Sequence, residues 1–316
     1  MKNKVLVTGG AGFIGSHLTD RLVEGGYKVV VADDLSRGRL ENVNAKADFE
    51  KIDVTSKKFL ELMKKITPDI IFHLAAQSDI GQSLKNSRKD IAVNFLATQT
   101  LLEQAKVLKI KKIIFASSAA VYAESKKLPV DEENIKEPIS LYGASKLLSE
   151  YLLQNYHKIR GLPYTSLRFA NVYGPKQDTS AEGGVVAIFI DKILRNNQVT
   201  IFGDGMQTRD FIYVSDIVEA CLLSLSNKVT GEFNIGTTQE TSILSLYKKL
   251  LDLSGAKDNK KFTKRRFLEV ARNSLSSEKF KNTTVWKPQV NLTHGLKLTF
   301  DYFQKNLNSL AEQRQL

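Results

Sequence analysis

The sequence feature that most constrains the fold is a glycine-dense turn between a short apolar strand and the start of a helix. A strand is predicted over residues 5–8, glycines follow at Gly9, Gly12 and Gly15, and residues 16–19 open a helix. Glycine lets the backbone turn tightly, lets a pyrophosphate approach closely and lets the helix pack hard against the strand. The free N–H groups at the helix N-terminus then hold the anion. The pattern therefore predicts a dinucleotide-binding strand, turn and helix.

An acidic residue ends the next strand, which is predicted over residues 28–32. Asp33 follows that strand and lies eighteen residues after Gly15. A carboxylate at this place accepts hydrogen bonds from the adenosine ribose and repels a 2′-phosphate. The spacing therefore favours NAD as the cofactor, while the nearby Arg37 leaves the use of NADP open.

Strands and helices alternate through the first half of the chain. Further strands are predicted over residues 49–54, 69–74 and 112–116, with helices over 56–65 and 90–106 between them. Such alternation is typical of a parallel sheet with right-handed crossovers. The predicted fold class is therefore α/β, a Rossmann-type doubly wound parallel sheet. In such sheets ligands bind beyond the C-terminal ends of the strands.

Several polar or small residues fall at these strand ends. Asp53 is placed to accept a hydrogen bond from the adenine amino group, and the small Ala75 and Ala76 let a cofactor lie against the backbone. Asn94 falls on the presumed inner face of its helix. His73 lies within a strand, so we expect a core histidine with satisfied hydrogen bonds and not a catalyst.

The regular alternation ends near residue 175. Loops, turns and short strands follow, and two apolar stretches near 211–236 are expected to return to the first domain as strands. We therefore predict a Rossmann domain over residues 1–175, with return segments near 211–236. Residues 176–316 are predicted to form a smaller, interleaved α/β substrate-binding lobe.

Composition and charge exclude several classes of protein. The single cysteine, Cys221, forms no intrachain disulfide and lies in an apolar helical pattern that predicts core packing. No apolar run is long enough to cross a bilayer, and Met1 is followed at once by the first strand, so we expect a cytoplasmic protein without a signal peptide. The net charge of +12 is spread over lysines interspersed with acids. We therefore expect no nucleic-acid or membrane partner and no metal site.

Three residues have the types and spacing that proton transfer to a sugar hydroxyl requires. Tyr142 and Lys146 lie four residues apart, one turn along a single helix face. A phenol is a poor base at neutral pH, but a neighbouring ammonium and a nicotinamide cation would stabilise the phenolate and lower its pKa. Ser118, at the end of its strand, would share a hydrogen bond with the substrate hydroxyl. The three residues are predicted to be catalytic.

The chain resembles the extended short-chain dehydrogenase/reductases and, within them, the UDP-glucose 4-epimerase family. The resemblance is carried by eight stretches that span nearly the whole chain: TGGAGFIGSH (8–17), DDLSRG (33–38), HLAAQ (73–77), SSAAVY (117–122), YGASK (142–146), LRFANVYGP (167–175), GDGMQTRDFIYVSD (203–216) and VWKP (285–288). It implies an NAD-dependent isomerase whose substrate is a UDP-sugar. Ser118, Tyr142 and Lys146 match the catalytic positions of the family.

The resemblance also assigns binding residues by position. The residues expected to contact NAD are Gly9, Gly12, Phe13, Ile14, Gly15, Asp33, Asp34, Ser36, Arg37, Gly38, Asp53, Val54, Leu74, Ala75, Ala76, Gln77, Asn94, Ser117, Tyr142, Lys146, Phe169 and Val172. The residues expected to contact the UDP-sugar are Ser118, Tyr142, Asn171, Val186, Phe202, Arg209, Arg266, Glu269 and Asn273. Arginine offers planar bidentate donors that match a diphosphate.

One segment departs from the family pattern. An R-P-G-D/E segment that holds the diphosphate and ribose in the family corresponds here to residues 266–269, RFLE, which keeps the charged ends and loses proline and glycine. Seven residues after Arg266 stands Asn273, where strict UDP-galactose epimerases have tyrosine. The smaller side chain predicts a pocket that admits glucose and galactose and also their N-acetyl forms.

The alternatives are another nucleotide-sugar-modifying enzyme of the same superfamily (a 4,6-dehydratase, a reductase or a decarboxylase) and a non-catalytic regulator. A nucleotide-sugar 4,6-dehydratase needs an Asp-Glu pair after the strand-end serine, where this chain has Ala119 and Ala120. A decarboxylase would need a residue dedicated to the sugar carboxylate. A non-catalytic NAD-sensing regulator would be expected to lack Tyr142 or Lys146, and both are present.

The resemblance also implies a homodimer formed through two helices of each subunit, here those near 90–106 and 142–158. The second helix carries more apolar residues than one core face needs: Leu147, Leu148, Tyr151, Leu152 and Leu153.

Overall fold

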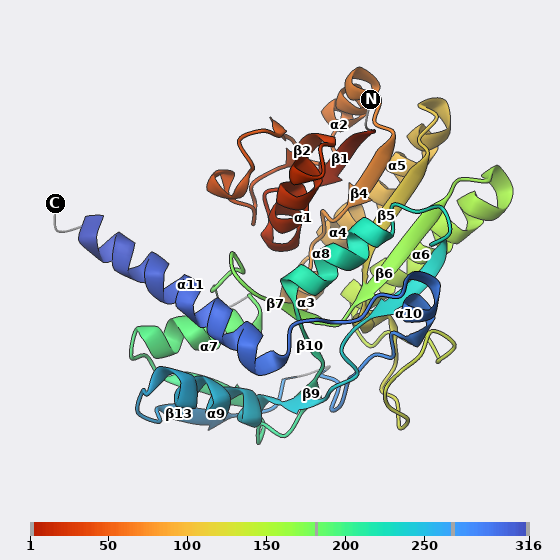
Figure 1. Ribbon diagram of the computed structural model, residues 1–316. Coiled ribbons are helices and arrows are strands. Elements are labelled where there is room, and N and C mark those ends of the chain that lie inside the picture. Colours follow the sequence, from red (N-terminus) through yellow and green to blue (C-terminus); the bar gives the residue numbers. More distant parts are fainter. Residues whose placement is uncertain (1–2, 181–182, 267–268, 314–316) are drawn as a thin grey trace.

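The chain folds around one large parallel sheet. The structure, a computed structural model, describes residues 3–180, 183–266 and 269–313. Seven strands form the sheet in the order β11-β6-β5-β4-β1-β2-β3, with every neighbouring pair parallel (Figure 1). Their bounds are β1 Lys4–Thr8, β2 Lys28–Asp33, β3 Asp48–Lys51, β4 Ile70–His73, β5 Lys112–Ser118, β6 Tyr164–Phe169 and β11 Gly231–Ile235. From β1 the chain adds β2 and β3 on one side of the sheet, and it then adds β4, β5, β6 and β11 on the other side. This reversal of strand order confirms the predicted doubly wound fold.

Helices cover both faces of this sheet. They are α1 Phe13–Glu24, α2 Lys57–Ile66, α3 Ile80–Lys85, α4 Ser87–Ile91, α5 Ala97–Val107, α6 Leu141–Arg160 and α8 Val214–Leu223. Val5 and Val7 of β1 join one hydrophobic core, which includes Leu18 of α1. Leu6, which points to the other face, joins a second core beneath α2, α5 and α6. This alternation explains why β1 is apolar throughout, as expected of a strand buried on both faces.

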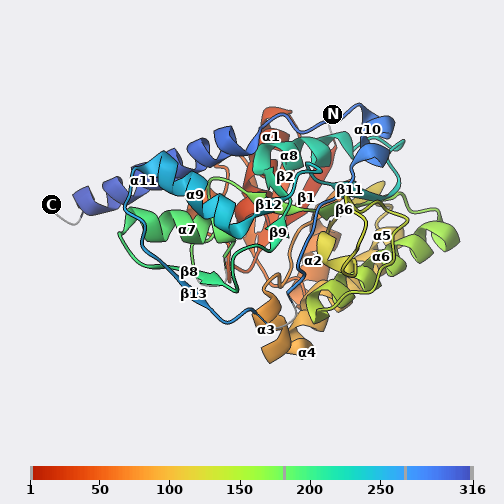
Figure 2. The same ribbon diagram turned by 90° about the horizontal axis from the view of Figure 1, so that it is seen from below.

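The remaining elements lie mostly beyond the C-terminal edge of the sheet. They are β7 Asn171–Tyr173, α7 Val185–Leu194, β8 Val199–Phe202, β9 Thr208–Arg209, β10 Phe211–Tyr213, β12 Thr241–Ser242, α9 Ile243–Ser254, β13 Lys260–Thr263, α10 Glu278–Thr284 and α11 Leu292–Gln313. Figure 2 shows α7, α9 and α11 grouped on one side of the molecule, while α5 and α6 lie together on the other. The division at residue 175 stays a prediction.

Some expected boundaries and one expected strand pairing differ from the structure. The first helix begins at Phe13, three residues earlier than expected, because Gly12 already serves as its N-cap. The strand expected over 211–216 ends at Tyr213, and its last three residues begin α8. β10 pairs with β7 in a small separate sheet, whereas β11 joins the large sheet beside β6.

The helix expected over residues 90–106 is interrupted. Ala92–Leu96 forms a single π-helical turn between α4 and α5. Within it the backbone carbonyl of Asn94 accepts hydrogen bonds from Thr98 Oγ1 and Ser149 Oγ, both at 2.8 Å. Single π-turns inside α-helices are frequent at functional sites, and apolar periodicity does not reveal them.

Candidate active site

A cavity of about 1300 Å³ opens at the C-terminal ends of the central strands. Of the residues expected to contact NAD, all but Asn94 and Val172 line it. They come from β2, β5, β6 and α6, from α1 with the turn before it, and from the loops that follow β2, β3 and β4. The cavity thus lies where a doubly wound sheet binds its ligand.

The glycine turn leaves no room for side chains. Gly9 has φ of +71°, and a Cβ added there would lie 2.8 Å from the backbone nitrogen of Ala75. A Cβ on Gly15 would lie 2.1 Å from the carbonyl oxygen of Gly9, where the first turn of α1 packs against the loop. The backbone of the turn is therefore bare towards the cavity. These residues fit the pyrophosphate of a dinucleotide.

Asp33 closes the adenosine end of the cavity. Its carboxylate accepts hydrogen bonds from the backbone N–H groups of Ala11, at 3.0 Å, and Leu35, at 2.8 Å. Burial raises the pKa of Asp33, and these hydrogen bonds oppose the rise. Asp53, which also lines the cavity, is exposed and accepts a hydrogen bond from the backbone of Thr55.

Asn94 lies behind the cavity wall and not on it. Its side-chain oxygen accepts from Gln77 N at 2.8 Å, and its amide nitrogen donates to Gln77 O and to Ser145 Oγ. Asn94 therefore ties the loop after β4 to α6. Val172 is half-buried and packs against the apolar core.

His73 is a structural residue, as the sequence predicts. Its ring nitrogens make hydrogen bonds with the hydroxyls of Thr8, at 2.8 Å, and Thr98, at 3.1 Å. Burial lowers the pKa of His73 to about 3, so the ring is uncharged at neutral pH.

Tyr142, Lys146 and Ser118 meet where α6 crosses the end of β5. The Lys146 ammonium is buried, donates to the carbonyl of Ala116 at 2.8 Å, and lies 5.9 Å from the centre of the Tyr142 ring. Burial lowers the pKa of Lys146 to about 8, against the raising effect of two carboxylates, those of Asp90 and Glu150.

The expected lowering of the tyrosine pKa is not found. Burial raises the pKa of Tyr142 to about 12; a hydrogen bond with Ser118 opposes the rise, and the charge of Asp90 adds to it. The expected lowering depends on a bound nicotinamide cation as well as on the ammonium one turn away, so it stays a prediction; desolvation of the phenol acts against it. Spacing along a helix says nothing about burial.

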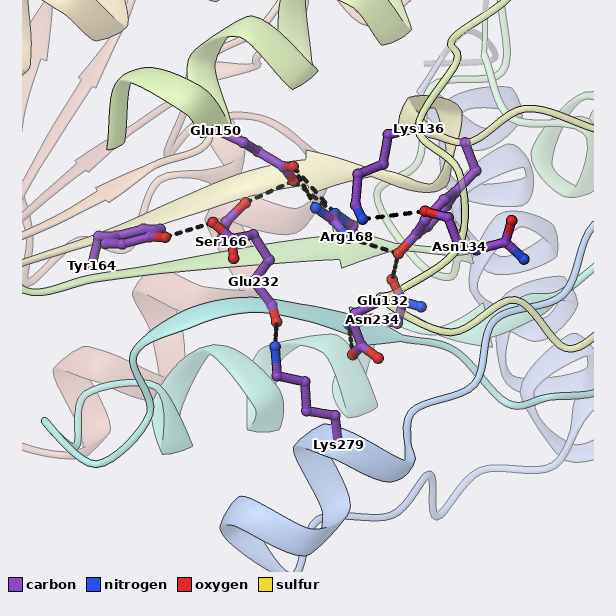
Figure 3. Close-up of polar contacts among 11 residues, drawn as sticks. Glu132, Asn134, Lys136, Glu150, Tyr164, Ser166, Arg168, Glu232, Asn234 and Lys279 are labelled. Carbon is purple, nitrogen blue, oxygen red and sulfur yellow. Dashed lines mark hydrogen bonds and ion pairs between the residues drawn. The ribbon is translucent and has the colours of Figure 1, made fainter. Parts of the chain in front are cut away.

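A buried ion pair holds α6 against the sheet. Glu150, one turn after Lys146, accepts hydrogen bonds from Arg168 at 2.7 to 3.2 Å and from Ser166 at 3.0 Å. Figure 3 shows Glu150 reaching from α6 to both residues on β6. Arg168 also donates to the Tyr122 hydroxyl, which in turn donates to Asn234 of β11. The network joins the helix that carries Tyr142 to two strands of the sheet.

The residues expected to bind the UDP-sugar do not line the cavity, apart from Tyr142. Arg209 and Glu269 instead form an ion pair at 3.0 Å, and Arg209 also donates to the carbonyls of Thr208 and Val270. The guanidinium of Arg266 stacks on the Phe202 ring at 4.1 Å from its centre. The middle two residues of the RFLE segment, 267 and 268, lie outside the described residues.

The other three expected substrate contacts differ in exposure. Asn171 is exposed on β7, and Val186 is buried in the apolar core beneath α7. Asn273 is half-buried, and its side-chain oxygen has no hydrogen-bond partner among the residues that the structure describes. The binding roles of these residues stay predictions.

Several residues that line the cavity were not predicted from sequence. They come from the loop before α7, from α7 and from α11, and include Lys176, Asp178, Arg195, Tyr302 and Phe303. α7 and α11 pack against each other, which carries these residues to the cavity. No local motif marks them, because their position depends on packing between distant segments.

The bare glycine turn and Asp33, at the strand ends of a doubly wound sheet, define a Rossmann-type dinucleotide-binding protein. The chain belongs to the NAD dependent epimerase/dehydratase family, whose sequence description matches residues 5–236. NAD is therefore its cofactor, in agreement with the prediction from the turn and Asp33.

Named relatives cover almost the whole chain. A putative UDP-glucose 4-epimerase of Methanocaldococcus jannaschii is 41% identical over 96% of this chain and 99% of its own. The crystal structure of the UDP-glucose 4-epimerase of Thermotoga maritima with UDP-glucose superposes with a TM-score of 0.93 at 41% identity, over 96% of this chain and 99% of that one. A UDP-N-acetyl-alpha-D-glucosaminuronate decarboxylase of Bacillus cytotoxicus is 33% identical over 96% of this chain and 99% of its own. The chain is thus more similar in sequence to these two epimerases than to this decarboxylase, and its family contains several activities.

No helix among the residues that the structure describes is long and apolar enough to span a membrane. The same part of the chain contains no cluster of three or more histidine, cysteine or acidic side chains that could hold a metal ion.

Proposed function

We propose that this protein is a UDP-hexose 4-epimerase that interconverts UDP-glucose and UDP-galactose and also accepts their N-acetyl forms. The observation that carries the proposal is the group of Tyr142, Ser118 and Lys146 at a dinucleotide cavity, followed by two alanines. Ala119 and Ala120, directly after Ser118, cannot transfer protons. Elimination of water from the sugar needs an acid–base pair, Asp-Glu, at these two positions. This site therefore favours epimerisation over dehydration.

When bound, NAD would supply reversible hydride transfer at C4 of the sugar, and a 4-keto sugar that turns between the two transfers would be reduced on its opposite face. Tyr142 removes the proton of the C4 hydroxyl as hydride leaves, and gives the proton back when hydride returns. Ser118 hydrogen-bonds the same hydroxyl and stabilises the Tyr142 phenolate. The Lys146 ammonium supplies the positive charge that a buried phenolate requires, since burial alone raises the pKa of Tyr142 to about 12. No net oxidation or proton release results.

The second lobe is proposed to hold the nucleotide and leave the hexose free to turn. Arg209 is fixed by Glu269 and by two backbone carbonyls, so its planar guanidinium has one orientation towards a diphosphate. Arg266 stacked on Phe202 places a cation beside an aromatic ring, a pair suited to a uridine phosphate. Asn171, Val186 and the segment that includes Asn273 complete the proposed site.

The N-acetyl forms are included because of Asn273. Its side-chain oxygen is buried and without a partner in the described part of the chain, and a buried acceptor is costly to leave unbonded. The N–H of an acetamido group is a donor of the required kind. The shorter side chain also leaves room that a tyrosine would fill.

The proposal is tested by adding UDP-galactose, and separately UDP-N-acetylgalactosamine, to the purified protein without cofactor. We expect both sugars to be converted to the gluco form, read by NMR at C4, because NAD must stay bound through each cycle. The ratio of the two rates measures the sugar preference. Absence of conversion even with added NAD would reject the epimerase and point to another nucleotide-sugar reaction.

We further propose that two copies associate through α6 and the segment 90–106, which contains the end of α4, the π-turn and most of α5. On this side of the molecule Ile91, Leu96, Leu148 and Tyr151 each expose close to half of their surface. On α6, Leu147 and Leu153 are buried, whereas Leu148 and Tyr151 are exposed on a separate face of the helix. The segments that carry these residues contact each other, and exposed apolar side chains gathered on neighbouring helices are typical of an interface between subunits.

Charges placed on that face are expected to give a monomer. Sedimentation of the Leu148→Lys/Tyr151→Lys protein should yield half the mass of the unmodified protein, since two unpaired lysines from each subunit, four in all, would be buried in the interface. Ile159→Lys, on the exposed end of the same helix, is the control and should leave the mass unchanged. A monomeric unmodified protein would contradict the proposal.

A further inference from the structure

An ion pair joins the two halves of the chain at the wall of the cofactor cavity. Arg37, in the loop after β2, donates through Nη1 to Asp178 Oδ2 at 3.0 Å. Both residues line the cavity, although 141 residues separate them in sequence. Each side chain is about one-third exposed, at 37% for Arg37 and 34% for Asp178, so the pair stands at the rim.

The loop that carries Arg37 folds directly over the ribose-binding carboxylate. A Cβ added to Gly38, the next residue, would lie 2.7 Å from Asp33 Oδ1. In dinucleotide-binding folds the acid at this place binds the ribose 2′-hydroxyl, and an arginine nearby accommodates the 2′-phosphate of NADP. Arg37 therefore has the position of a phosphate-binding arginine, beside an acid that selects against phosphate.

Asp178 is the ion-pair partner of Arg37. Its carboxylate is itself fixed, because the Ser180 hydroxyl donates to it at 2.7 Å and the Ser180 backbone N–H at 2.9 Å. Burial acts to raise the pKa of Asp178, but Ser180 and the charge of Arg37 outweigh burial and lower it, so the group is an anion at neutral pH. The positive charge of Arg37 is thus neutralised by a residue of the other half of the chain.

We infer that Asp178 is a second determinant of cofactor choice: it holds Arg37 away from a 2′-phosphate and adds a negative charge where that phosphate would sit. Asp33 repels the phosphate directly, whereas Asp178 removes the cation that would attract it. The inference concerns the cofactor and does not depend on which sugar is converted, so its failure would leave the proposed epimerase untouched.

The pair also connects two segments, and the test must separate that effect from cofactor choice. The junction between the two halves of the chain also includes contacts of α1 with residues just before Asp178: Lys176 with Asp20 at 3.2 Å, and His17 Nε2 with the Pro175 carbonyl at 2.9 Å. Asp20 is 34% exposed, as Asp178 is, and does not line the cavity. Asp20→Asn is therefore a matched control that removes one carboxylate from the same junction.

The experiment compares the unmodified protein with the Asp178→Asn, Asp20→Asn and Arg37→Leu/Asp178→Asn proteins. Each is incubated with an equimolar excess of NAD and NADP until the bound ratio no longer changes, and free nucleotide is removed by desalting. Bound nucleotides are released by acid and quantified by chromatography. Circular-dichroism melting checks that each protein is folded.

Asp178→Asn is expected to raise the bound ratio of NADP to NAD about tenfold, the effect of one charge-assisted hydrogen bond to phosphate. Asp20→Asn should leave the ratio unchanged, and Arg37→Leu/Asp178→Asn should lose the gain. An unchanged ratio in Asp178→Asn would show that the pair only joins the two segments and would overturn the inference. A gain that persists without Arg37 would overturn it as well.

Discussion

Replacing Tyr142 by phenylalanine is expected to lower turnover by about 10²- to 10⁴-fold, the usual contribution of a positioned proton-transfer group. The phenol is the group that removes the C4 hydroxyl proton, and the ring of phenylalanine keeps its packing. Binding of UDP and NAD should therefore change little, since neither depends on that proton. Turnover is measured by NMR at C4, and binding by calorimetry with UDP.

The control for this substitution is Tyr156→Phe. Tyr156 lies on the same helix and is partly buried against the second core. Its substitution removes a phenol hydroxyl, as Tyr142→Phe does. The Tyr156→Phe protein should keep nearly full turnover. Full activity of the Tyr142→Phe protein would rule out the proposed proton transfer, whereas equal losses in both proteins would indicate damage to α6.

Replacing Glu150 by alanine is expected to lower the free energy of unfolding by about 3–5 kcal/mol, the cost of leaving a buried charge without its partner. Arg168 is 3% exposed and makes three hydrogen bonds to Glu150. Burial acts to lower the pKa of Arg168, but the hydrogen bonds and charge of Glu150 raise it above its usual value. Arginine is not deprotonated in proteins, so the guanidinium stays charged when it loses its partner. Urea denaturation measures the change.

An exposed ion pair provides the comparison. Lys297 and Asp301 lie at 2.8 Å on α11, almost the distance between Arg168 and Glu150, but both are more than half exposed. Asp301→Ala should change the free energy of unfolding by no more than about 0.5 kcal/mol, because solvent screens such pairs. Equal effects of the two substitutions would contradict the view that the buried pair anchors α6.

Glu150→Gln gives a second readout at the site itself. Glu150 raises the pKa of Lys146, against a burial effect that lowers it to about 8. Without that carboxylate Lys146 loses its proton at lower pH, and the phenolate of Tyr142 then loses its countercharge. The alkaline fall of the turnover rate should therefore begin at lower pH in Glu150→Gln. An unshifted profile would limit Glu150 to a structural role.

The sequence alone determined the fold class and the cofactor end of the site. The glycine turn, the strand-end Asp33 and the pair of Tyr142 and Lys146 are local patterns, each contained in one strand, turn or helix. Their physical reasons are short-range: backbone room for glycine, an acid at a strand end, and residues one turn apart. The parallel sheet then brings all strand ends to one edge, so residues predicted separately lie in one cavity.

Only the tertiary structure decided which partner each charged residue has. Arg209 pairs with Glu269, and Arg37 with Asp178, because loops far apart in sequence pack against each other. It also decided the protonation chemistry: Tyr142 and Lys146 are one turn apart in any helix, but burial raises the pKa of one to about 12 and lowers that of the other to about 8. Desolvation and long-range charge depend on everything that surrounds a group, and neighbouring letters in a sequence do not contain that information.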